Sequence, residues 1–228
     1  MLTEPEWNAV ATSLKVATAS VALGLPFAIG LGYFLARWRS AGKWIVETAV
    51  NLPLVLPPVV TGYLLLLLMG RNGALGRLLD EFLGWRVVFT WYAAVAAGAI
   101  VSFPLMVRTI RVSFRSVDTR LEEAARSLGR SRFSTFYRVS LPLALRGIVA
   151  GSVLGFARTL GEFGATIMVA GNIPGQTQTI PTAIYSLVQS PGGWDRSKRL
   201  LLVSVLLACV TLAASEILER RRERHELS

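Results

Sequence analysis

Three long stretches without a charged residue dominate this sequence. They contain 21, 23 and 21 residues and lie between Lys15 and Arg37, between Glu47 and Arg71, and between Arg86 and Arg108. A helix of about 20 residues is long enough to cross the ~30 Å hydrocarbon core of a bilayer. Each stretch is therefore predicted to be a membrane-spanning helix, and the chain must satisfy its backbone hydrogen bonds in lipid.

Two further apolar stretches extend the pattern. One, at about residues 147–171, carries Arg158 and Glu162, and the other, residues 200–215, is short for a crossing. The prediction is an all-α integral membrane protein with five transmembrane helices in one domain, residues 1–228. The spans are expected at about residues 12–36, 46–70, 87–112, 144–171 and 199–219. The N-terminal MLTEPEW is acidic, so the first span is not expected to be a cleaved signal.

The basic residues give the predicted orientation. One alternating set of loops and ends holds 16 Lys and Arg residues, whereas the other holds 7. Cytoplasmic loops carry the excess of Lys and Arg, so the N-terminus is predicted outside and the C-terminus in the cytoplasm. This distribution explains the net charge of +10 without a nucleic-acid partner.

The composition also excludes several kinds of chemistry. Only one cysteine, Cys209, and one histidine, His225, are present, so neither a disulfide framework nor a zinc site is expected. An enzyme within the membrane would need paired catalytic groups, and the predicted spans offer only Arg158 and Glu162. We therefore predict no catalytic residue, no metal ligand and no cofactor bound by this chain.

A loop of about 30 residues, far longer than most connections between helices, separates the third and fourth spans. Within its core, residues 116–142, apolar residues recur at helical spacing. Thr119 and Glu122 have the spacing of a capping box, and Gly129 lies where a left-handed C-cap would end the helix. A second helical face at residues 133–137 is expected to stop before Pro142.

Two interpretations of this helix–glycine–helix loop remain open from spacing alone. A basic amphipathic hairpin can rest on anionic lipid at the membrane surface. Alternatively, the loop is a docking site for another protein. A stand-alone channel or secondary transporter gives no reason for a helical cytoplasmic loop of this length.

The residues of the loop resemble a known motif. Its defining positions are occupied by Glu123, Ala124, Ala125, Gly129, Val139, Leu141 and Pro142. This string is similar to the EAA loop by which permease subunits of bacterial ABC importers dock on their ATPases, with Val139 in place of the usual isoleucine. The resemblance implies ATPase-coupling roles for Glu123, Ala124, Ala125, Gly129, Leu141 and Pro142. It also implies that ATP and Mg²⁺ bind to the partner ATPase, and the chain indeed lacks the Walker pattern GxxxxGK[ST].

Four other segments extend the resemblance to the molybdate-importer permeases. They are LPLVLPPVV at 52–60, SFPLMVR at 102–108, GEFGAT at 161–166 and GNIPGQTQTIP at 171–181. The resemblance implies a homodimer in the inner membrane, an ABC ATPase and a periplasmic molybdate-binding protein as partners. Sulfate and tungstate permeases look similar around residues 161–164 and stay as alternatives.

The second predicted span contains Pro53, Pro57 and Pro58. These prolines remove backbone donors and bend or open the helix, which a bilayer tolerates where protein or a water-filled cavity satisfies the freed carbonyls. The span is therefore a candidate wall of the transport pathway, and ordinary helix packing is the alternative. Thr166 is a further polar candidate for the pathway or gate, together with Asn51, Thr61 and Ser102.

Arg158 and Glu162 stand four residues apart in the fourth predicted span, on one helix face. Charged residues inside a membrane are costly and mark functional candidates. Arg158 can attract the transported oxyanion, or the two residues can form a neutralising pair that supports packing between subunits. After this span, the spacing of Ile180, Ile184 and Leu187 predicts a short external helix behind Pro181.

Overall fold

The computed structural model describes residues 2–226, with side chains at all of these positions except 83 and 214–226. The ends of the predicted domain, residues 1 and 228, lie outside the described residues. All regular elements in the described part are helices, which confirms the predicted all-α class. In chain order they are α1 (Glu4–Arg37), α2 (Lys43–Val55), α3 (Pro58–Met69), α4 (Ala74–Leu83), α5 (Trp91–Ser116), α6 (Thr119–Ser127), α7 (Arg132–Thr135), η1 (Phe136–Ser140), α8 (Leu141–Leu160), α9 (Gly164–Ala170), α10 (Ile180–Val188) and α11 (Gly193–Glu226).

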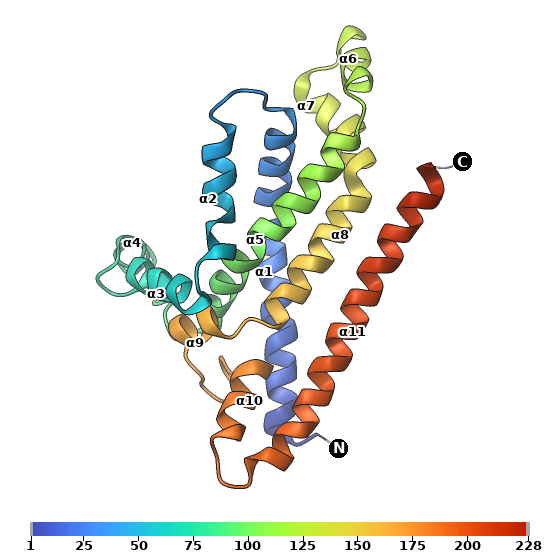
Figure 1. Cartoon of the computed structure of the whole chain (residues 1–228). Helices are drawn as coiled ribbons and strands as arrows, with labels where there is room; N and C mark the ends of the chain where they lie inside the picture. Colours follow the sequence, from blue (N-terminus) through green and yellow to red (C-terminus); the bar gives the residue numbers. More distant parts are fainter. Residues whose placement is uncertain (1, 227–228) are drawn as a thin grey trace.

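Three long helices, α1, α5 and α8, form the centre of the molecule and pack along most of their lengths (Figure 1). Small residues permit their close approach. Gly98 of α5 lies against Ser20 of α1 and Thr159 of α8, and Gly147 of α8 lies against Ser113 of α5. The hydroxyl of Ser20 donates to the carbonyl of Val95, 2.9 Å away, so this polar group between α1 and α5 is satisfied within the bundle.

Among the described residues, three helical stretches are long and apolar enough to cross a membrane: Glu4–Arg37, Trp91–Ser116 and Arg132–Leu160. A fourth crossing is added if α2 and α3 are counted as one bent span. The predicted fifth span, residues 199–219, lies within α11, which runs from the α10 end toward the α6 end beside α8 (Figure 1). Side chains from 214 onward are outside the described set, so the count of five remains a prediction.

The second span, predicted over residues 46–70, is bent, as its prolines predicted. Helices α2 and α3 meet at an angle of 109°, with the break at Leu56 and Pro57. Pro58 is the first residue of α3, where a missing N–H costs nothing. Pro53 remains inside α2, so the adjacent pair Pro57 and Pro58, rather than Pro53, marks the break.

The fourth span, predicted as one helix over residues 144–171, is also interrupted. Helix α8 ends at Leu160, and α9 begins only at Gly164. The physical reason is a side-chain cap at the start of α9. A side-chain oxygen of Glu162 accepts a hydrogen bond from the backbone N–H of Ala165 at 2.9 Å. This carboxylate satisfies an N-terminal donor of α9 and so stabilises a new helix start in the middle of an apolar stretch.

The end of the bundle that contains the N-terminus is closed by α10, which confirms the predicted helix behind Pro181 (Figure 1). Its start is held by α1, since the backbone N–H of Ile180 donates to the hydroxyl of Ser13 at 2.7 Å. At the opposite end, α6 and α7 extend beyond the central helices (Figure 1). Helix α1 thus contacts the elements at both ends of the molecule.

Candidate coupling surface and interrupted-helix site

Helix α6 starts at Thr119, one residue earlier than predicted, because the predicted capping box made Thr119 the N-cap. Asp118 is the N-cap, and its carboxylate accepts a hydrogen bond from the backbone N–H of Arg120 at 2.9 Å. Thr119 is therefore the first helical residue, and the predicted reciprocal pair of Thr119 and Glu122 is wrong. Asp118 is the stronger cap because its charge also complements the positive end of the helix dipole. The carboxylate of Glu122 is consequently free for another contact.

Gly129 ends this helix as the sequence predicted. Its φ is +84°, in the left-handed region that glycine adopts without steric cost. The N–H of Gly129 donates to the carbonyl of Arg126 at 3.0 Å, and the N–H of Arg130 donates to the carbonyl of Ala125 at 3.1 Å. These two bonds form a Schellman motif, which turns the chain sharply from α6 toward α7.

The prediction that the second helix of the hairpin stops before Pro142 is wrong. Instead α7, η1 and α8 form one continuous helix, Arg132–Leu160, that leads from the hairpin into the bundle. Residues 136–140 adopt a π-helical turn, in which the N–H of Leu141 bonds to the carbonyl of Phe136. This wider turn accommodates the ring of Pro142, which would clash with the preceding turn of a regular α-helix. Leu141 and Pro142 therefore lie at the junction between hairpin and span.

Glu122 anchors the hairpin to the bundle, a role that sequence spacing did not reveal. Its side chain is only 6% exposed and forms an ion pair with Arg37 at the end of α1, with an N–O distance of 2.6 Å. The Nε atom of Arg37 lies 3.1 Å from both carboxylate oxygens. The hydroxyl of Ser140, in η1, donates to Glu122 at 2.7 Å. One carboxylate thus joins three segments that are far apart in the sequence.

The opposite side of the hairpin is open to solvent. Glu123 and Ala124 are exposed, Ala125 is half-buried, and Gly129 is exposed. Large apolar side chains surround them and are 49–84% exposed in the structure: Leu121, Leu128, Phe133 and Tyr137. An exposed apolar surface with small residues at its centre is typical of a protein interface. The small residues of the predicted coupling motif, Ala124, Ala125 and Gly129, therefore lie on one accessible surface, the docking face, and the exposed Glu123 lies at its edge.

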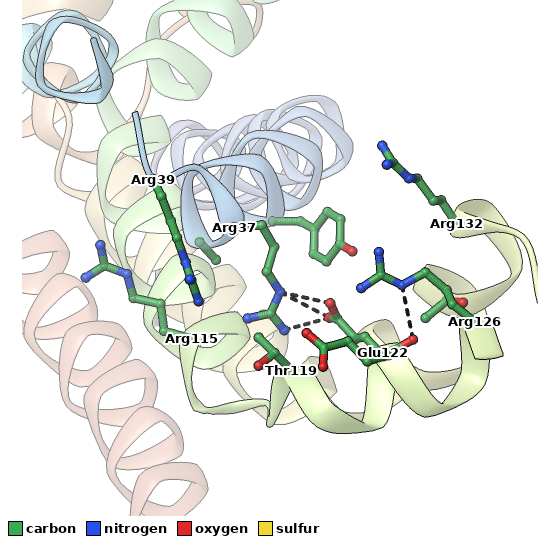
Figure 2. A pocket seen from close by; sticks show the side chains of 11 residues that line it. Arg37, Arg39, Arg115, Thr119, Glu122, Arg126 and Arg132 are labelled. Carbon is green, nitrogen blue, oxygen red and sulfur yellow. Dashed lines mark hydrogen bonds and ion pairs between the residues drawn. The ribbon is translucent and has the colours of Figure 1, made fainter. Parts of the chain in front are cut away.

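A pocket of about 630 Å³ lies on the bundle side of this hairpin. Figure 2 shows Arg37 reaching the carboxylate of Glu122, while Arg126 donates to the backbone carbonyl of the same residue. Five arginines contribute to the lining, from four separate parts of the chain: Arg37, Arg39, Arg115, Arg126 and Arg132. The two acidic residues that line it are Glu122 and Glu123. The pocket is therefore positively charged.

The second candidate site is formed by the two interrupted spans, because α3 packs on α9. A Cβ atom added at Gly164 would lie 2.8 Å from the Cβ of Pro58, and one added at Gly62 would lie 2.8 Å from the Cα of Ala165. The backbones therefore approach each other as closely as glycine allows. Among the predicted pathway residues, Pro58, Glu162 and Thr166 lie at or beside this contact, whereas Pro53 belongs to α2.

Arg158 and Glu162 form an ion pair within one chain, with an N–O distance of 2.8 Å. The Glu162 side chain is 2% exposed, whereas that of Arg158 is 30% exposed. Since the other carboxylate oxygen of Glu162 caps α9, both oxygens have partners. Thr166, in the first turns of α9, is buried. The pair occupies the break between α8 and α9, where it supports the backbone of the interruption.

A further ion pair joins α2 and α5. Arg111 of α5 pairs with Glu47 of α2. Glu47 marks the end of one uncharged stretch and Arg111 lies just beyond the end of another, so nothing in the sequence suggested that they meet. Asn51 donates to the carbonyl of Glu47 at 2.6 Å and lines a pocket of about 300 Å³ with Arg108 and Arg111.

Two of the remaining polar candidates make no contact across the proposed pathway. The hydroxyl of Ser102 donates to the carbonyl of Ala99 within its own helix, at 3.3 Å. The hydroxyl of Thr61 is buried without a hydrogen-bond partner in the described part of the chain. The bond of Ser102 is an ordinary contact within a helix, and Thr61 has no bond that would assign it to a pathway.

Similar sequences support one family. A family model described as "Binding-protein-dependent transport system inner membrane component" matches residues 28–224. The molybdenum transport system permease protein ModB of Escherichia coli (strain K12) is 51% identical over 225 residues, 98% of each chain. ModB of Haemophilus influenzae is 48% identical over 96% of each chain. The sulfate transport system permease protein CysW of Synechococcus elongatus is 36% identical, over 95% of this chain and 75% of its own.

Solved structures share the fold at low sequence identity. A chain of the MetNI methionine ABC transporter in inward-facing conformations has a TM-score of 0.72 and 17% identity, over 96% of this chain and 99% of its own. A chain of a bacterial alginate ABC transporter, in complex with an alginate pentasaccharide-bound periplasmic protein, has a TM-score of 0.71 and 19% identity, over 96% and 80%. With the family match across most of the sequence, the chain belongs to the inner membrane components of binding-protein-dependent transport systems.

Proposed function

We propose that this chain is the membrane-spanning subunit of an ATP-driven importer that carries molybdate into the cytoplasm. The observation that carries the proposal is 51% identity to the Escherichia coli ModB over 98% of both chains. The proposal includes five membrane crossings, an outer N-terminus and a cytoplasmic C-terminus. The chain itself catalyses no reaction, because ATP and Mg²⁺ belong to a separate ATPase.

The docking face is the proposed contact with that ATPase. Ala124, Ala125 and Gly129 present a small-residue surface with apolar neighbours, which can fit closely into a groove of the partner, and the exposed Glu123 lies beside this surface. The buried Glu122 transmits the contact, since it holds the hairpin against α1 and η1. Leu141 and Pro142 continue the connection into α8. Two copies of the chain would present two such hairpins to the two ATPase sites, and a periplasmic binding protein would deliver the anion.

The two interrupted spans support a pathway at membrane depth. Broken helices leave backbone groups without their regular partners, which a bilayer tolerates only where protein or water satisfies them. The contact of α3 with α9 brings both interruptions together in one region, beside Pro57, Pro58 and Thr166. A change in the angle between these short helices would open or close the route while α1, α5 and α8 keep their packing.

Transport with competing anions tests the function. Cells that lack their own molybdate permease, with the ATPase and binding protein present, should regain uptake of radiolabelled molybdate when this chain is expressed. A fivefold excess of unlabelled tungstate or sulfate measures the alternatives, of which sulfate is favoured by the 36% identity to CysW. Uptake of labelled sulfate without uptake of labelled molybdate would replace the proposed substrate. No uptake of any of the three anions, despite assembly with the ATPase, would exclude the function.

Cysteine accessibility tests the orientation. In a Cys209→Ser background, Ser131→Cys places a single exposed thiol in the hairpin, and Gln176→Cys places one in the loop before α10. We expect a membrane-impermeant maleimide to label position 176 in intact spheroplasts and position 131 only after the membrane is opened. Labelling of position 131 from outside, with position 176 protected, would reverse the proposed topology.

The Arg158–Glu162 pair is expected to be structural. Glu162→Gln keeps an oxygen that can accept from Ala165 but leaves Arg158 without a counter-charge, so uptake should fall. Adding Arg158→Met removes the unpaired charge and should restore much of that loss, because neutral replacement of a buried pair is often tolerated. Uptake is measured per assembled complex. A double variant that assembles fully and transports nothing would instead place Arg158 in the anion pathway.

A further inference from the structure

The pocket behind the docking face has more positive charge than its own carboxylates can balance. Of the five arginines that line it, Arg37 is paired with Glu122. Arg126 donates through Nε to a backbone carbonyl, at 3.3 Å, and not to a carboxylate. Glu123 supplies one more negative charge at the rim, where it is exposed. The formal charge of the eleven lining residues, five arginines against two glutamates, is therefore positive by three.

Three of these guanidinium groups have no ion-pair partner within the described side chains: Arg39, Arg115 and Arg132. All three are exposed residues whose side chains border the same pocket. Figure 2 shows Arg39 and Arg115 on one side of the Arg37–Glu122 pair and Arg126 and Arg132 on the other. Like charges around one cavity repel one another, weakly where they are exposed to water, and an anion in the cavity would reduce this repulsion.

We propose that this pocket binds a tetrahedral oxyanion of the phosphate class. A guanidinium group offers a planar fork of donors that matches two oxygens of such an anion, and several forks around one cavity can each take different oxygens. The hydroxyl groups of Tyr33 and Thr119 also line the pocket and provide neutral donors. The same chemistry is presented by a free oxyanion in solution and by the phosphate of an anionic lipid headgroup.

The position of the pocket gives the bound anion a structural effect. Arg39 follows α1 and Arg115 belongs to α5, so both are parts of the bundle, whereas Arg126 and Arg132 belong to the hairpin. An anion held by arginines of both groups would join hairpin and bundle, in addition to the single buried contact through Glu122. Occupancy would therefore change how firmly the docking face is held. This inference does not depend on which anion the chain transports.

Binding to the full-length chain tests the proposal. The chain is purified in a neutral detergent and titrated with inorganic phosphate by calorimetry. The variant is Arg39→Gln with Arg115→Gln, and the control is Arg71→Gln with Arg77→Gln, two exposed arginines at α4 outside the pocket. For a free oxyanion we expect saturable binding that weakens about tenfold or more in the pocket variant, since each lost charged hydrogen bond is worth roughly one order of magnitude. The control should bind like the native chain.

A second arm distinguishes the lipid source. The same three proteins are reconstituted in nanodiscs of phosphatidylcholine with one-fifth phosphatidylglycerol and released for native mass spectrometry. Retention of phosphatidylglycerol by the native and control chains, lost in the pocket variant, assigns the site to a headgroup phosphate. If the pocket variant behaves like the native chain in both arms, or if the native chain binds neither probe, the proposal is wrong.

Discussion

Glu122→Ala should release the hairpin of α6 and α7 from the bundle and abolish most transport while the protein still inserts in the membrane. The substitution removes the partner of Arg37 and the acceptor of Ser140. Breaking a buried ion pair costs about 3–5 kcal/mol, and the 21% exposure of Arg37 places this pair toward the lower end. A loss of that size exceeds the ~1.4 kcal/mol that changes an equilibrium tenfold. We therefore expect uptake below about a tenth of the native rate.

Trypsin measures the release directly, since the hairpin carries Arg126, Arg130 and Arg132. Cleavage in inside-out vesicles should be much faster in the Glu122→Ala variant than in the native chain. Glu123→Ala is the matched control, because this neighbouring carboxylate is exposed and forms none of the anchoring bonds. It should leave the cleavage rate unchanged even if it weakens association with the ATPase. Equal rates for the native chain and the Glu122 variant would show that the carboxylate does not anchor the hairpin.

Gly62→Ala is the second substitution for which we expect a large effect, because it should push α3 and α9 apart. The new Cβ atom would lie 2.7 Å from the Cβ of Met168 and 2.8 Å from the Cα and carbonyl oxygen of Ala165. Two of these three atoms are backbone, so a side-chain rotation cannot relieve the contact. Overpacking of this kind costs about 1–3 kcal/mol, and α9 must move away from α3. The midpoint of thermal unfolding should fall, and uptake should fall with it.

Gly30→Ala provides the comparison for this variant. Gly30 lies in α1, and an added Cβ there would meet no atom within 4 Å. The same substitution in a helix without a clash stabilises by roughly 0.5–1 kcal/mol, because alanine loses less backbone entropy than glycine. The two variants should therefore shift the unfolding midpoint in opposite directions. A Gly62 variant with native stability and native uptake would mean that the close contact of α3 and α9 is unimportant.

The sequence was sufficient to predict local features whose causes lie within a few residues. The uncharged stretches predicted the long helices α1 and α5, and Gly129 predicted the left-handed turn between α6 and α7. The repeat behind Pro181 predicted α10. In each of these regions the helical period and the capping residue stand side by side in the chain, so short-range reasoning was adequate.

Features that depend on distant partners were not predictable in the same way. Glu122 and Arg37 are 85 residues apart, and Glu47 and Arg111 are 64 apart, so no spacing rule connects them. The break after Leu160 depends on the carboxylate of Glu162, which the sequence presented only as one half of a charged pair. Pro142 seemed to end a helix, but the π-helical turn before it allows the helix to continue.

Helix α1 connects the two ends of the bundle mechanically. It is a single helix of 34 residues, about 50 Å long, that continues through Pro26 without interruption. Arg37 at one end holds the hairpin of α6 and α7, and Ser13 near the other holds the first residue of α10. A displacement of the hairpin that preserves its ion pair must therefore pull or push on the opposite end of the bundle. The two ends of the bundle are thus connected by one continuous helix, and a motion of the hairpin can reach α10 without passing through the broken helices.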